Sequence, residues 1–255
     1  MDDAAADGQA PPYVRVRAEP DLDPALDGMH VARGRPVLVS VGGADGMTPE
    51  DLDRMAELVR DHVIPAVDRW GAAVVDGGTD SGVMRVLGQA RRLAGSSFPL
   101  VGVAAEGTVV VPGAAATSPD AAELDPGHTQ VVLVPGDRWG DESPWIAAVA
   151  DVIAAGGPSL TLVVNGGRIT YDDIRHSLAR RRPVVVVAGT GRTADAIASA
   201  ARGGAADDPA ADIARSPLVR VADLDDGEAL RDVLDEVLGG GRLAPVDCPS
   251  GDRRS

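Results

Sequence analysis

The sequence contains no lysine, and all 24 of its basic residues are arginine. Schiff-base chemistry on a lysine amine and a P-loop lysine are therefore excluded. The single cysteine, Cys248, excludes an internal disulfide and a multi-cysteine zinc or iron–sulfur site. The histidines show no metal-ligand spacing, so we expect no metal site.

Long apolar runs are also missing. None approaches the roughly 20 residues that cross a bilayer, and the N-terminal residues lack the basic and apolar segments of a signal peptide. We therefore expect a cytoplasmic protein that makes no contact with a membrane. We also expect a homo-oligomer.

Aromatic residues are scarce, at 2% of 255 residues, whereas apolar residues make up 44% of the chain. This length and composition suffice for a substantial core built of small aliphatic side chains. The net charge of −15 argues against a broad surface for nucleic acid. A small anionic ligand remains compatible with it, because backbone N–H groups and a few arginines can hold a phosphate.

Near-continuous apolar runs predict parallel strands that are buried on both faces, at 36–41, 72–76, 100–104, 130–135, 160–165 and 183–188. Helical patterns alternate with them. The first helix is expected to be capped by Thr48, kinked by Pro65 and ended by Gly71, and others are expected from about Ser81 and at 144–155, 171–180, 193–202 and 227–238. This alternation predicts an α/β fold: a Rossmann-like, doubly wound, mainly parallel sheet with helices on both faces.

The domain organisation follows from composition. Residues 1–33 are rich in Ala, Asp and Pro, which predicts an extended N-terminal arm. Residues 34–238 are expected to form one Rossmann-like domain that includes a loop at 201–210, and 239–255 a flexible C-terminal tail.

Glycine-rich loops follow five of the expected strands. Glycine lets backbone N–H groups approach a phosphate closely, and each following helix presents its positive end there. Sharp turns also need glycine, but five such loops on one rim favour an anionic, nucleotide-like ligand. The ligand-binding candidates in these loops are Gly42, Gly43, Gly77, Gly78, Thr79, Ser81, Gly82, Val83, Gly107, Thr108, Gly166, Gly167, Thr190, Gly191 and Arg192.

One fingerprint is absent from these loops. No G-x-G-x-x-G follows the first expected strand. The sequence therefore argues against an ordinary dinucleotide-dependent dehydrogenase.

Five segments resemble one known family in the same order along the chain. They are VVDGGTDSGVMRVLGQA (74–90), VGVAAEGTV (101–109), LDPGHTQVVLV (124–134), WGDESP (139–144) and VVVVAGTGRTADAIA (184–198). Together they resemble the SLOG domain of melastatin-type TRP channels and their prokaryotic relatives, over about residues 36–202. The resemblance implies a Rossmann-like fold and a pocket for a nucleotide-derived ligand such as ADP-ribose, with no cofactor required.

The wider superfamily also contains the cytokinin-activating phosphoribohydrolases. Those enzymes carry a P-G-G-x-G-T-x-x-E motif whose glutamate serves hydrolysis. The nearest segment here, 76–85, has no glutamate in the first turn of the expected helix. The resemblance therefore does not carry this hydrolytic activity over.

Three arginines are candidates for a phosphate contact. Arg192 is the strongest, because the channel domains carry an arginine at the matching position that reaches the ligand's phosphates. Its guanidinium can grip a phosphate in a bidentate way that backbone amides cannot. Arg85 can equally lie on the exposed face of its helix, and Arg168 fits either role.

Four further residues are candidates, and three of them carry two interpretations each. Trp139 can stack on a purine or cover the core edge. Asp137, on the same loop, is a second ligand-contact candidate. Asp76 can shape its glycine loop or contact a ligand. His128 is more commonly a histidine hydrogen-bonded to the backbone at a strand entrance than a catalytic base.

We expect a sensor or carrier of a nucleotide-derived ligand rather than an enzyme. One alternative is a hydrolase of an N-glycosidic or phosphoribosyl bond, in which a pocket carboxylate with a raised pKa acts as acid or base. Its candidate carboxylates are Asp45, Asp80, Glu106 and Asp137. The other alternative is a non-binding assembly module, which predicts a collapsed pocket.

Overall fold

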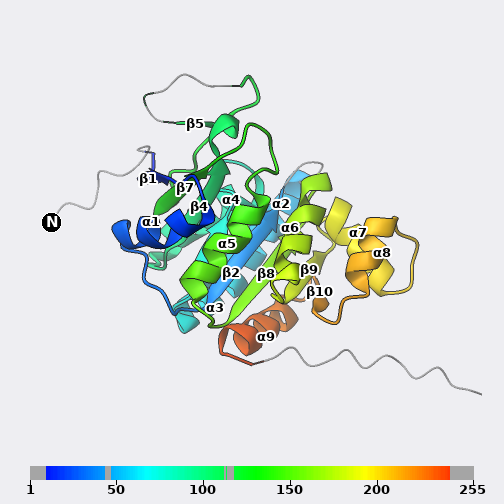
Figure 1. Cartoon of the computed structure of the whole chain (residues 1–255). Coiled ribbons are helices and arrows are strands. Elements are labelled where there is room, and N and C mark those ends of the chain that lie inside the picture. Colours follow the sequence, from blue (N-terminus) through cyan, green and yellow to red (C-terminus); the bar gives the residue numbers. More distant parts are fainter. Residues whose placement is uncertain (1–9, 44–46, 112, 114–117, 242–255) are drawn as a thin grey trace, which may run out of the picture.

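A parallel sheet forms the centre of the molecule in the computed structural model, which describes residues 10–43, 47–111, 113 and 118–241. Helices cover both faces of this sheet (Figure 1). Its eight strands are ordered β1-β7-β4-β3-β2-β8-β9-β10, and every neighbouring pair is parallel. The doubly wound α/β fold predicted from the sequence is confirmed.

The strands are short, and the six between the edge strands β1 and β10 are mostly buried. They are β1 (Tyr13–Arg15), β2 (Val37–Gly42), β3 (Ala73–Asp76), β4 (Leu100–Ala105), β7 (Gln130–Val134), β8 (Ser159–Val164), β9 (Val184–Ala188) and β10 (Val219–Asp223). A separate two-stranded pair consists of β5 (Val109–Val110) and β6 (Ala122–Glu123).

The order of the strands creates a switch point in the middle of the sheet. From β2 the chain proceeds to β3 and β4 on one side, and after β7 it returns to β8, on the other side of β2. Connections therefore leave the carboxyl ends of β2 and β8 in opposite directions. In open α/β sheets a crevice forms outside the strand ends at this position.

Alternate residues of the strands enter cores on opposite faces of the sheet, and opposite the first core β7 and Ala104 of β4 contribute to a third, smaller one. On β2, Val37 and Val39 belong to one core and Leu38 to the other. The first core is shared with α1 (Leu22–Gly28), α5 (Ser143–Ala154), α6 (Arg168–Ala179), α7 (Arg192–Ala201) and α8 (Asp208–Ala214). The second is shared with α2 (Pro49–Leu58), α3 (Ile64–Trp70), α4 (Gly82–Ala94) and α9 (Gly227–Leu238). Burial on both faces explains why the strands are continuous apolar runs.

The helix signals at 48–71 are confirmed with one modification. The Thr48 hydroxyl accepts a hydrogen bond from the Asp51 N–H at 3.1 Å, and Gly71 ends α3 with a φ of 58°. Between α2 and α3, Val59–Val63 form a π-helical segment. Pro65 follows directly, and because proline lacks an N–H and its ring crowds the preceding turn, it is compatible with this wider turn.

The expectation of an extended arm over 1–33 is wrong for residues 10–33. β1 extends the sheet by pairing with β7, and α1 follows a short 3-10 turn, Glu19–Asp21. Leu22 and Leu26 of α1 are fully buried in the core that contains α5. Leu22 and Leu26 have the i, i+4 spacing of one helix face, but a single such pair among Ala, Asp and Pro residues is too short a signal to predict a helix.

The other boundaries differ less. α8 begins inside the expected loop 201–210, and β10 was not predicted. The expected tail lies outside the described residues from 242 onward, as do Cys248 and Asp45. Across the described ranges, no helix combines the length and apolar character needed to cross a membrane.

Candidate functional site

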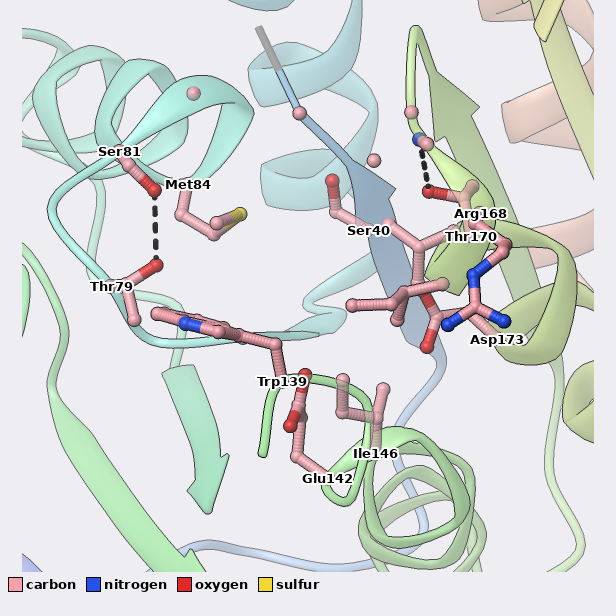
Figure 2. A pocket seen from close by; sticks show the side chains of 18 of the residues that line it. Ser40, Thr79, Ser81, Met84, Trp139, Glu142, Ile146, Arg168, Thr170 and Asp173 are labelled. Carbon is pink, nitrogen blue, oxygen red and sulfur yellow. Dashed lines mark hydrogen bonds between the residues drawn. The ribbon is translucent and has the colours of Figure 1, made fainter. Parts of the chain in front are cut away.

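A pocket of about 550 Å³ lies at the switch point. Ser40, Val41 and two glycines contribute from the end of β2, and Gly166 and Gly167 contribute from the end of β8. The first residues of α4, α6 and α7 complete the rim. Figure 2 shows Thr79 and Ser81 on one side of the pocket and Arg168 and Thr170 on the other. The crevice expected for a doubly wound sheet is thus open, and it is not a collapsed seam.

Most of the predicted ligand-binding residues meet in this pocket. Those that line it are Gly42, Gly43, Gly77, Thr79, Ser81, Gly82, Thr108, Trp139, Gly166, Gly167 and Arg192. Sequence reasoning left Arg168 open, and this residue also lines the pocket. The lining residues that sequence reasoning did not single out are Ser40, Val41, Met84, Ala104, Glu142, Ile146, Ile169, Thr170 and Asp173.

Six predicted ligand residues lie outside the pocket lining: Gly78, Val83, Gly107, Asp137, Thr190 and Gly191. Gly78 has a φ of +69°, and a Cβ on it would lie 2.9 Å from the Cα of Gly102 on β4. It therefore serves a tight turn and a close approach to β4. Val83 belongs to the core beneath α4.

Thr190 is also structural in its contacts. Its buried hydroxyl donates to the Val187 carbonyl at 2.6 Å and accepts from the Asn165 N–H at 2.8 Å. This arrangement ties the end of β9 to the end of β8. Gly107 approaches the backbone of Asp137, whose own side chain is exposed.

Two arginines stand at the rim on adjacent helices. Arg168 and Arg192 are the first residues of α6 and α7, and both are exposed. The Arg192 backbone adopts a left-handed φ of 50°, which is uncommon outside glycine. Its guanidinium lies over Gly167, where a Cβ would come within 3.0 Å of Nη2. Helix N-termini and guanidinium groups both favour anions, so this side of the pocket suits phosphate oxygens.

Trp139 provides an aromatic surface on the other side. Its side chain is 41% exposed and extends from the β7–α5 loop toward Thr79 (Figure 2). The Thr79 and Ser81 hydroxyls are hydrogen-bonded to each other at 3.2 Å. An exposed indole beside polar hydroxyls can stack on a purine base.

Two buried carboxyl groups face the same pocket. Glu142 precedes α5, and its carboxylate accepts the Gly140 N–H at 3.0 Å. Burial raises the pKa of Glu142, although its backbone hydrogen bonds oppose this effect. Burial also raises the pKa of Asp173, on α6, to about 7; the Ser143 hydroxyl opposes the shift, and the negative charges of Glu142 and Asp172 add to it. Neither acid stood out in the sequence, because a single carboxylate on or next to a helix usually faces solvent.

The carboxylates named for the hydrolase alternative lie elsewhere. Glu106 is paired with Arg15 at 2.6 Å and with Arg17 at 2.5 Å. The hydrogen bond from Arg17 lowers the pKa of Glu106, burial opposes it, and Arg15 lowers it further. Asp80 is paired with Arg85 at 2.7 Å. Neither these two nor Asp137 lines the pocket, and Asp45 lies outside the described residues.

The prediction that His128 is hydrogen-bonded to the backbone is wrong, because its ring nitrogens contact carboxylate side chains. Its ring is fully buried between two carboxylates, with Nε2 2.7 Å from Asp76 and Nδ1 3.0 Å from Asp125. Burial alone would lower the pKa of His128, but the two carboxylates outweigh it and raise the pKa to about 10. Asp76 also accepts the Gly78 N–H at 2.8 Å, which favours its loop-shaping role.

The comparison with known families agrees with this geometry. The family described as "SLOG in TRPM, prokaryote" matches residues 35–231. The chain belongs to this family. No curated protein matches the chain.

SLOG membership supports a general role in binding or processing a nucleotide-related ligand. The match begins just before β2 and ends within α9, so it spans every residue that lines the pocket. It also includes α8 and β10, so the SLOG domain extends beyond residues 36–202, the range over which the sequence resembles the family.

Proposed function

We propose that this SLOG domain is a sensor or carrier that binds a nucleotide-derived ligand such as ADP-ribose in the switch-point pocket. The observation that carries the proposal is the meeting of three kinds of group in one open pocket. Glycine loops and helix N-termini, with Arg168 and Arg192, suit phosphates, and Trp139 suits a base. An assembly module with a collapsed pocket is disfavoured by the 550 Å³ volume.

The experiment is calorimetry with ADP-ribose, cyclic ADP-ribose, NAD and AMP. We expect Arg192→Ala to weaken binding about tenfold or more, because a charge-assisted hydrogen bond contributes roughly 1.5–3 kcal/mol. Arg85→Ala is the matched control, since Arg85 is exposed, paired with Asp80 and outside the pocket lining. Equal affinities of wild type and Arg192→Ala would contradict the assignment of Arg192.

Hydrolysis of an N-glycosidic bond is a second candidate function. Asp173 favours it, because a carboxyl group with a pKa near 7 inside the pocket can protonate a departing base. Water would then add its hydroxyl to the sugar carbon, and the base would leave with a proton. Against it, the first turn of α4 offers the core residue Val83 and the ion-paired Arg85 where the related hydrolases place glutamate.

Product analysis separates the two candidates. We expect AMP, NAD and ADP-ribose to be recovered intact after incubation with the protein at high concentration. Release of adenine or nicotinamide above a protein-free control, abolished by Asp173→Asn, would establish the hydrolase instead.

A further inference from the structure

Two buried polar atoms in the pocket lining lack a hydrogen-bond partner among the described residues. They are Oγ of Ser40, on β2, and Oδ1 of Asp173, on α6. Ser40 is 1% exposed and Asp173 is 9% exposed, so neither side chain lies in open solvent. Buried polar groups in folded proteins are nearly always hydrogen-bonded, and leaving one unsatisfied is costly. The two atoms therefore point to a ligand that supplies the missing hydrogen bonds.

The charge around Asp173 determines what kind of group that ligand must present. The charged groups that act on it are the carboxylates of Glu142 and Asp172, and no ion pair within the described ranges involves Asp173 or Glu142. Phosphate oxygens would be repelled by this cluster and are better placed near Arg168 and Arg192. Hydrogen-bond donors without negative charge fit here, because carboxylate oxygens accept them.

The positions of Glu142 and Asp173 indicate which part of a nucleotide would supply these hydrogen-bond donors. Glu142 lies beside Trp139 at one side of the pocket, and Asp173 lies with Arg168 at the other (Figure 2). A nucleotide bound with its base on Trp139 and its phosphates near Gly166, Gly167 and Arg168 has its ribose between them. The ribose carries two adjacent hydroxyl groups, each of which can donate and accept a hydrogen bond.

We propose that Asp173 and Glu142 bind the vicinal hydroxyl groups of the ligand's ribose, with Ser40 as an additional hydroxyl partner. This inference rests on the proposed nucleotide-binding function and extends it to the sugar. The two carboxyl groups make the pocket selective for ribonucleotides over their deoxy counterparts. Glu142 keeps its orientation through the Gly140 N–H, and Asp173 is held by the rigid turn of α6.

The exocyclic amine of adenine is another donor that could satisfy a carboxylate, and the test includes it as a separate arm. Dissociation constants are measured for ADP-ribose, ADP, 2′-deoxy-ADP, 3′-deoxy-ADP and inosine diphosphate. The variants are Asp173→Ala, Asp173→Asn and Glu142→Gln. Asp172→Asn is the matched control, because Asp172 lies on the same helix, is paired with Arg175 at 2.9 Å and lies outside the pocket lining.

We expect wild type to bind ADP on the order of tenfold or more tightly than at least one deoxy analogue, since hydrogen bonds to charged groups are strong. Asp173→Ala should remove this preference and leave the ratio of the dissociation constants for ADP and inosine diphosphate unchanged. Glu142→Gln and Asp173→Asn, which preserve shape, should reduce the preference without unfolding the chain. Asp172→Asn should behave as wild type.

Four results would overturn the proposal. Wild type could bind deoxy analogues as tightly as ADP, or Asp173→Ala could weaken ADP and the deoxy analogues equally; in both cases nucleotide binding itself would stand. Loss of the preference for ADP over inosine diphosphate in Asp173→Ala would assign the acids to the base. Absence of binding by wild type to every probe, ADP-ribose included, would refute the proposed function as well.

Discussion

Two groups of buried ionisable side chains among the described residues, one around His128 and one in the pocket, differ in whether their charges are compensated. Around His128, a protonated imidazole stands between Asp76 and Asp125, and both ring nitrogens have a partner. In the pocket, Asp173 and Glu142 have no counter-ion within the described residues. Oδ1 of Asp173 lacks a hydrogen-bond partner, as does Oδ2 of Asp76 in the His128 cluster, so the two groups differ in charge compensation rather than in hydrogen bonding.

The difference separates a structural cluster from a functional one. Buried charges that compensate one another specify and rigidify a fold, whereas a buried carboxyl group without a counter-ion in a cleft costs stability and is retained where a ligand completes it. The His128 cluster holds the turn at Gly78 and the loop before β7 against the sheet. The two acids in the pocket are placed to accept hydrogen bonds from a bound ligand.

The largest expected effect comes from breaking the compensated cluster. His128→Ala leaves two carboxylates buried without their cation, so we expect a loss of about 3–5 kcal/mol in unfolding free energy. The folded-state pKa is raised from 6.5 to about 10, so the stabilisation is fully present below about pH 6.5 and is lost as the pH rises through 10. Urea unfolding at several pH values measures it.

His176→Ala is the matched control, since His176 lies on the last turn of α6 away from these carboxylates. A loss in His128→Ala no larger than in this control would show that the cluster is not a stabilising element.

Replacing the pocket acid Asp173 should have the opposite effect on stability from replacing His128. Asp173 has a folded-state pKa raised from 3.8 to about 7, so the folded state binds more protons and stability falls as the pH rises through that window. We expect Asp173→Asn to gain up to a few kcal/mol relative to wild type between pH 4 and pH 7, because each unit of pKa corresponds to about 1.4 kcal/mol. Chemical denaturation of both proteins across this range tests it.

Asp172→Asn, the exposed neighbour, is again the control. If the difference between Asp173→Asn and wild type were independent of pH, Asp173 would not be a destabilised acid, and the contrast with His128 would disappear.

A substitution at Gly78 tests whether this glycine serves the fold rather than the ligand. A valine there would crowd the Gly102 backbone and resist the φ of +69°. We expect Gly78→Val to cost about 1–3 kcal/mol from overpacking. The midpoint of its thermal unfolding should fall. At temperatures below that midpoint, where the variant is folded, its affinity for the ligand should match that of wild type. A variant that folds normally but no longer binds nucleotide would show that Gly78 belongs to the site.

The strands and most helices could be predicted because their signals are local. β2 and β9 are continuous apolar runs since both faces are buried, and Thr48 and Gly71 mark helix ends by their own chemistry. β1 has three residues and pairs with β7, more than a hundred positions away. Such a short strand depends on its partner, and the alternation of apolar and charged residues at 14–17 is too brief a signal to predict it.

The site shows the same division. Glycines and Arg192 follow strands in the sequence, so the parallel topology gathers their loops at one edge. Asp173 lies on the second turn of α6, where composition cannot tell an inward carboxylate from a solvated one. Conversely, Gly78 and Thr190 share the glycine-loop pattern, yet the structure uses them for packing and for backbone hydrogen bonds.

Nuclear magnetic resonance of the tryptophan indole N–H groups tests the central claim most directly. Trp139 lines the pocket, Trp145 is partly buried on α5, and the Trp70 indole donates to Asp235 at 2.8 Å outside the pocket lining. Titration with ADP-ribose should shift the Trp139 signal until it saturates and leave that of Trp70 in place. In Arg192→Ala, a higher ADP-ribose concentration should be needed for saturation. If the Trp139 signal stayed unchanged at saturating ADP-ribose, ADP-nucleotides and NAD, the switch-point pocket would not be a nucleotide site.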